Sequence, residues 1–149
     1  MKALLRLTFV SLVLAAAPLL AQSKGAFLEK TVDVPRDFRV PVELSYEKAR
    51  IVSVESAMEP KEKDVKNASE KDTQIMMLRF YYENPGYVKH KVTLKAVLLD
   101  EAGGVVADGS GTRTLDAKTD EDTVSFFVKV KTVDWPRAKQ MKVFATFLN

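Results

Sequence analysis

The most informative absence in this 149-residue chain is cysteine, of which it has none. Without cysteine the protein forms no disulfide, carries no thiol nucleophile and offers no thiolate to a metal. Histidine is nearly absent as well, since His90 is the only one. A metal site built from histidine and cysteine is therefore excluded, and general-base work by His90 would need an orienting partner that the sequence does not mark.

Motifs that carry chemistry are also missing. The sequence has no Gly-x-Ser-x-Gly elbow, no His-Glu-x-x-His pair and no phosphate-binding glycine loop. Among its 20 acidic residues no pair is distinguished by its surroundings as a pair of catalytic carboxylates. We therefore expect a protein that is not an enzyme and that uses no cofactor and no metal.

A large excess of one sign of charge is missing too. The whole chain has 23 basic and 20 acidic residues, and Lys2 and Arg6 fall in an amino-terminal segment that we expect to be removed. The rest has 21 basic residues against the same 20 acidic ones, a net charge of +1. Nucleic-acid-binding domains usually show a strongly basic face, so we expect no nucleic-acid partner.

Residues 1–21 have the layout of a secretory signal peptide. A basic start is followed by an apolar run from Leu7 to Ala17, and polar residues begin at Gln22. We expect cleavage after Ala21 or after Ser23, with export to the periplasm or the exterior. The alternative is an uncleaved anchor, but a spanning helix needs about 20 apolar residues, so we expect no stable membrane insertion after signal removal.

The remaining 22–149 fit a single domain of ordinary size. Its centre is the stretch from Thr73 to Asp100, in which two apolar runs flank a tight corner at Asn84-Pro85-Gly86. Long runs of aromatic and branched residues bounded by turn residues are typical of strands. This pattern predicts a hairpin in the middle of a sheet.

Shorter alternating segments before and after this stretch bring the count to about seven or eight strands, without a convincing amphipathic helix. Regularly spaced strands and turns favour an all-β fold, an antiparallel immunoglobulin-like β-sandwich. A closed barrel is the alternative, because the spacing of strands along the sequence does not show whether a sheet closes on itself. The glycines of Asp108 to Gly111 predict a bulge. The predicted core includes Phe80, Leu94, Leu98, Phe126 and Val128.

The central segment, from Thr73 to Lys131, resembles the FxLYD family of bacterial and archaeal envelope domains. The naming motif falls on Ala96-Val97-Leu98-Leu99-Asp100, in which Leu98 and Asp100 match while Ala96 and Leu99 replace the Phe and the Tyr. The resemblance implies an immunoglobulin-like sandwich in the cell envelope and implies no activity.

Two charged segments have open interpretations. Glu59 to Asp72 reads as a long exposed loop with a helical turn where Glu62 and Lys66 lie four apart, either a functional loop or a solvated excursion. The acidic turn from Asp116 to Asp122 either binds a hard cation or is a solvated turn, and it lacks the regular spacing of a calcium loop.

The first candidate interaction site is the strand Phe38 to Tyr46. Its apolar residues alternate with polar ones, and Pro41 lies on the polar face, which predicts an edge strand because proline cannot donate to a ladder. An exposed edge pairs with an extended partner segment, so Arg39, Pro41 and Glu43 are candidate interaction residues. Proline also blocks such pairing, and both interpretations stay open.

A second candidate site is a lysine stripe. If Val92 and Val128 face inward, the lysines of their strands face outward, and they form one stripe if the two strands are neighbours. Such a stripe suits a polyanion or an acidic membrane surface, whereas the alternative is a lysine coat that keeps a sheet soluble. The lysines are Lys89, Lys91, Lys95, Lys129 and Lys131.

Two functions from different classes fit these observations. The first is a non-enzymatic exported module that binds an envelope or extracellular protein. The second is a carrier that holds a small apolar ligand in a sandwich or barrel cavity. An internal cavity of several hundred Å³ would favour the carrier, and a filled core would favour the module.

Overall fold

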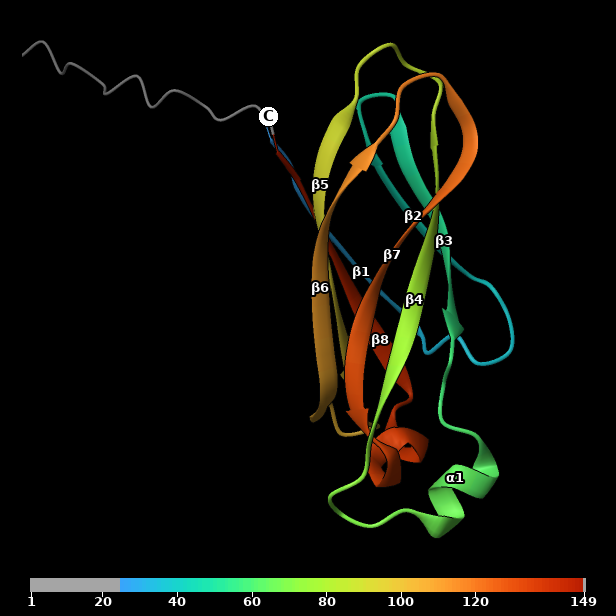
Figure 1. The fold of residues 1–149 in the computed structure, drawn as a ribbon. Coiled ribbons are helices and arrows are strands. Elements are labelled where there is room, and N and C mark those ends of the chain that lie inside the picture. The colour runs from blue at the N-terminus through green and yellow to red at the C-terminus, as the bar shows by residue number, and fades with distance from the viewer. Residues whose placement is uncertain (1–24, 149) are drawn as a thin grey trace, which may run out of the picture.

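The computed structural model describes residues 25–148, which form two four-stranded antiparallel sheets packed as a sandwich (Figure 1). The predicted signal peptide and its cleavage positions lie outside the described residues. Sheet A has the order β1-β8-β5-β6 and sheet B the order β2-β3-β4-β7. The all-β sandwich predicted from strand count and spacing is confirmed, and the barrel alternative is wrong because the strands form two separate sheets.

The elements follow one another along the chain with these bounds: β1 Phe27–Asp33, β2 Val40–Tyr46, β3 Ala49–Ala57, α1 Glu62–Asn67, β4 Thr73–Asn84, β5 His90–Leu99, β6 Val105–Leu115, β7 Thr119–Lys131, the 3-10 helix η1 Thr132–Arg137, and β8 Gln140–Leu148. The two short helices pack together at one end of the sandwich, which we call the helical end. The predicted helical turn is α1, in which Lys66 Nζ lies 2.7 Å from Glu62 Oε1.

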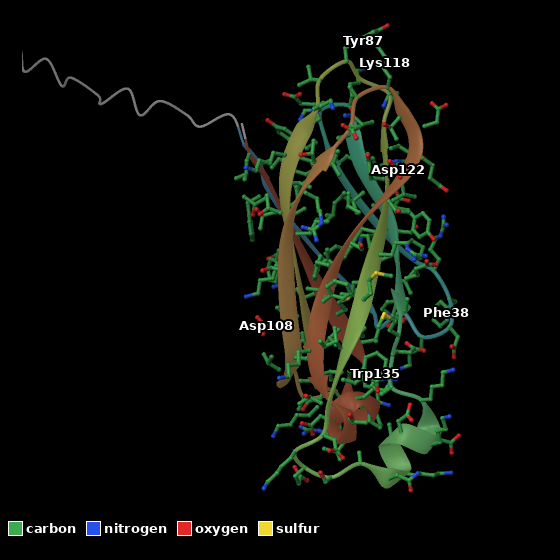
Figure 2. All side chains as sticks on the ribbon, in the orientation of Figure 1. Phe38, Tyr87, Asp108, Lys118, Asp122 and Trp135 are labelled. Atoms are coloured by element: carbon green, nitrogen blue, oxygen red, sulfur yellow. The ribbon has the colours of Figure 1, made fainter. Side chains whose placement is uncertain are left out.

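Both sheets contribute to one core, because every second residue of the long strands faces inward. The five residues predicted as core are all buried, and Phe126 stacks on Phe80 with ring centroids 5.5 Å apart. Trp135 of η1, only 3% exposed, closes the core at the helical end (Figure 2).

The predicted hairpin at Asn84 to Gly86 is wrong. Strand β4 belongs to sheet B and β5 to sheet A, so the corner carries the chain from one sheet to the other. Stacked sheets lie about 10 Å apart, and the five residues from Pro85 to Lys89 are enough to cross that distance. Asn84 fixes the crossing, because its buried Nδ2 donates hydrogen bonds to Val88 O at 2.8 Å and Leu115 O at 3.4 Å.

Three local differences from the predicted pattern have physical causes. Phe38 was expected to face inward, yet it is 59% exposed on a loop that projects beside β3, because the strand begins only at Val40. Val52 is the extra residue of a bulge in β3, which turns it away from the buried face. The bulge predicted at the β6 glycines falls instead at Val106, and the glycines have another role.

Candidate functional site

The middle of the outer face of sheet B is apolar. Met77 of β4 pairs with Phe127 of β7 on one side and with Ala57 of β3 on the other, and Ile75 lies on the next outward position of β4. Cross-strand neighbours have Cβ atoms about 5 Å apart, so these side chains form a continuous surface. Phe127 is 60% and Ile75 52% exposed. We call Ala57, Ile75, Met77 and Phe127 the sheet B patch.

Next to the patch, a network of polar and aromatic side chains is held in a fixed arrangement. Glu55 Oε1 accepts hydrogen bonds from Arg79 Nη1 and from the Tyr81 hydroxyl, each at 2.8 Å. The guanidinium of Arg39 stacks on the Tyr81 ring at 3.3 Å and lies 3.5 Å from Glu121. The Tyr81 hydroxyl and the Glu55 carboxylate raise the pKa of Arg79, and the hydrogen bond to Glu55 holds the guanidinium in position. This ordering lowers the entropy cost of binding through these groups.

The outer face of sheet A is crossed by polar contacts in its middle. Lys95 lies 3.5 Å from Asp108 and Lys142 lies 3.3 Å from Glu29, and the ammonium of Lys142 also covers the Phe144 ring at 5.2 Å. Its exposed apolar side chains are placed toward the ends of strands, at Phe27, Val105 and Leu148. In sheet B, by contrast, the large exposed apolar side chains Ile75 and Phe127 belong to one continuous patch.

The predicted lysine stripe is not assembled, because β5 is in sheet A and β7 in sheet B. Lys89 and Lys95 form ion pairs with Asp116 at 2.7 Å and Asp108 at 3.5 Å, and Lys91 is exposed on the same outer face as Lys95. Within residues 25–148, Lys129 and Lys131 have no ion-pair partner and flank the sheet B patch. The condition that the two strands be neighbours therefore fails.

The strand with Pro41 is an edge strand, as predicted, since β2 ends the order of sheet B. Its ladder is interrupted, because β2 has an extra residue between Pro41 and Leu44 and Glu43 adopts a φ of 55°. Arg50 holds Glu43 at 3.3 Å, and Arg39 turns away onto Tyr81. Proline and bulges both discourage pairing with an added strand, so this edge is protected.

The other edges are obstructed too. On β1, Lys30 pairs with the buried Val143 and so stands on the core-facing side while remaining exposed, and inward-pointing charge protects an edge. Strands β6 and β7 cover each other, and Arg113 Nε of β6 donates to Ser125 O of β7 at 2.8 Å. Interaction through a face is therefore better supported than interaction through an edge.

His90 and the acidic turn form no metal site. His90 is 6% exposed, packs edge-on against Tyr46 and Phe147, and lies 3.6 Å from Glu47, so it is a packed residue at the end of the core. Asp116 is paired with Lys89, and Glu121 with Arg39. Across residues 25–148 no group of three histidine or acidic side chains could hold a metal ion.

Three pockets, of about 390, 480 and 600 Å³, lie at the helical end. Their walls come from loops, helices and the ends of β3 and β4 at the helical end, with Trp135 and Arg36 in the second. Arg36 stacks on Trp135 at 4.1 Å and its Nη2 donates to Trp135 O and Ala138 O, while burial lowers its pKa. This arginine thereby ties the β1–β2 loop to η1.

No helix among the described residues has the length and apolarity to cross a membrane.

The chain matches no family model and no curated protein. Among solved structures, it is similar over 85% of its length to the enzymatically active domain of tailspike protein 4 from bacteriophage CBA120, with 13% identity and a TM-score of 0.32. It is similar over 68% of its length to an arabinose-bound MgGH51 α-L-arabinofuranosidase, with 14% identity and a TM-score of 0.15. The chain covers only 17% and 22% of those two chains, and likenesses this low carry no argument about function.

Sequence reasoning missed the sheet B patch, although one signal for it was present. Phe127 interrupts the alternation of Val124, Phe126, Val128 and Val130 with an aromatic residue on the outward side. Phe127 becomes part of a patch only together with Met77 and Ala57. These three residues are neighbours because the strand order is β3-β4-β7.

Proposed function

We propose that this protein is an exported, non-enzymatic interaction module that binds another protein through the sheet B patch. The observation that carries the proposal is the apolar surface of Met77, Ile75 and Phe127, placed beside an ordered Arg79–Glu55–Tyr81 network. Contiguous exposed apolar surface marks interaction sites, and aromatic residues, methionine and arginine are enriched in interfaces.

The charges around the patch specify the chemistry of the partner. Lys129 and Lys131 lie at one end of the patch without acidic partners among the described residues, so the partner presents an apolar centre with acidic charge at one end. The carrier alternative requires a cavity between the sheets. The three pockets lie at the helical end, walled by loops, helices and the ends of β3 and β4, which supports a module over a carrier.

Export rests on the amino-terminal sequence pattern, and mass spectrometry of the protein from its own host tests it. We expect a mature chain that starts at Gln22 or Lys24, whereas an intact Met1 to Ala21 in a membrane pellet would contradict export. Kinship with FxLYD-type envelope domains is likewise part of the proposal, supported by Leu98 and Asp100 alone.

A photo-crosslinking residue placed at Phe127 tests the proposed surface in the producing host. Thr112, exposed on the outer face of sheet A, is the matched control position. We expect a discrete protein adduct from position 127 that is lost when Met77→Asp is added, and none from position 112. No adduct from position 127, or equal adducts from both positions, would contradict the proposal.

A further inference from the structure

The outer row of β7 has a gradient of charge along the strand. Register with β4 places alternate residues of β7 outward, and in order these are Glu121, Thr123, Ser125, Phe127, Lys129 and Lys131. The row therefore begins acidic, is aromatic near its middle and ends basic. Residue 126 lies midway between Glu121 and Lys131, about 16 Å along the strand from each of them. The exposed Phe127 is the next residue and lies near the centre of the row.

A row of this kind is complementary to itself when it is turned end for end. We infer that the partner of the sheet B patch is a second copy of this chain, with the two patches packed face to face about a two-fold axis beside Phe127. This inference rests on the proposed function. A two-fold interface joins the same surface of both copies, so each contact occurs twice.

The direction of the axis follows from the charges. An axis across the strands at the level of residue 126 reverses the row. Lys131 of one copy then lies near Glu121 of the other, which also contacts its own Arg39, and Lys129 lies over Thr123. Because Leu78 pairs with Phe126, the same axis places Met77 over the aliphatic part of Arg79 and Ile75 over the Tyr81 ring of the other copy. An axis parallel to the strands would instead place each residue of β4 over the same residue of the other copy. Arg79 would then face Arg79, and these like charges repel.

The area of this face predicts a weak dimer. Strands β3, β4 and β7 are together about 14 Å wide, and the levels from Thr73 to Glu83 span about 33 Å, which gives roughly 450 Å² per copy in projection. About 900 Å² for two copies is below the roughly 1,200 Å² of standard specific interfaces and falls among weak, transient ones. We therefore expect a dissociation constant on the order of 10 to 100 µM that rises with salt.

Sedimentation equilibrium of the purified mature protein, from micromolar to several hundred micromolar, tests the dimer. We expect Phe127→Asp to abolish association and Lys131→Glu to weaken it about tenfold. Glu121→Lys should weaken it similarly. The double variant, Lys131→Glu with Glu121→Lys, should restore affinity to within about threefold of wild type, because the exchanged charges meet again across the axis. Lys95→Glu on sheet A is the control and should change nothing.

Thermal unfolding of each variant at low concentration separates lost association from lost folding. A wild-type protein that stays monomeric over the whole range overturns the inference, and so does a double variant as weak as the two single ones. The proposed function is judged separately: an adduct at Phe127 to a different protein would support it while contradicting the second copy, and no adduct together with a monomer would contradict both.

Discussion

Gly111 of β6 lies against Phe126 of β7, so close that a Cβ at position 111 would stand 2.8 Å from the Cβ of Phe126. Two residues earlier, a Cβ at Gly109 would stand 2.7 Å from the carbonyl oxygen of Phe127. Strands β6 and β7 are the last strands of the two sheets on the same side of the sandwich. The absence of side chains at these two glycines therefore lets the backbone of β6 pack directly against β7, which closes this side of the sandwich.

We predict that Gly109→Ala and Gly111→Ala each destabilise the protein by about 1 to 3 kcal/mol, because the added methyl group must push β6 away from β7. Ser110→Ala, which lies between them and is exposed, should stay within about 0.5 kcal/mol of wild type. Urea unfolding of the three variants measures the difference. Glycine variants as stable as Ser110→Ala would show that the close approach does not constrain the fold.

Two adjacent phenylalanines give a second comparison. Phe126 is 2% exposed and stacked on Phe80, whereas Phe127 is 60% exposed on the outer face. Phe126→Ala should cost about 3 to 5 kcal/mol of unfolding free energy. Phe127→Ala and Lys129→Ala, measured at low micromolar concentration, should each change it by less than about 0.5 kcal/mol. Equal losses at 126 and 127 would mean that the register of β7 is reversed.

The buried face of each long strand was predictable, because strict alternation decides which side chains leave water. Phe126 and Val128 were assigned to the core from this period alone, and both are buried. The partner of a strand was not predictable in the same way. A corner such as Asn84 to Gly86 fits both a hairpin and a crossing between sheets, because both arrangements bury the same residues of β4 and β5.

The candidate site was less predictable than the fold for a related reason. Pro41 marks an edge locally, and the structure places it on one. The sheet B patch, in contrast, exists only because β3, β4 and β7 are neighbours, and no local pattern specifies that order. Arg39 likewise joins the face through contact with Tyr81 of a distant strand, after the chain leaves the sheet at the β1–β2 loop.

A third prediction concerns the crossing between the sheets. Asn84 is fully buried, and its amide nitrogen satisfies the carbonyl groups of Val88 and Leu115. Asn84→Ala removes this donor from the buried Leu115 carbonyl and from the Val88 carbonyl, so we expect a loss of about 1 to 3 kcal/mol in unfolding free energy. Asn67→Ala is the control, since the Asn67 amide also bonds a carbonyl, that of Lys63, but on the exposed surface of α1. Chemical unfolding of both variants should separate them, and equal losses would show that the buried bonds add nothing.

The last prediction concerns pH and the turn between β5 and β6. Asp100 Oδ1 accepts hydrogen bonds from the amides of Gly104 at 2.7 Å and Ala102 at 3.0 Å, and Oδ2 lies 3.0 Å from Arg137 Nη2. These contacts, the Gly104 amide first, lower the pKa of Asp100 below the usual aspartate value. A carboxyl group with a lowered folded pKa stabilises the protein above its unfolded pKa, and this stabilisation disappears as pH falls through the folded value.

Asp100→Ala should therefore lower the urea midpoint at pH 7, and the gap to wild type should narrow as pH falls below the usual aspartate pKa and close once the folded carboxyl is protonated. Midpoints measured in steps from pH 7 down to about pH 2.5 follow this change. Glu101→Ala is the control, because Glu101 makes no hydrogen bond or ion pair among residues 25–148, and its midpoint should follow wild type throughout. A gap between wild type and Asp100→Ala that is constant with pH would show that Asp100 acts through its shape in the turn and not through its charge.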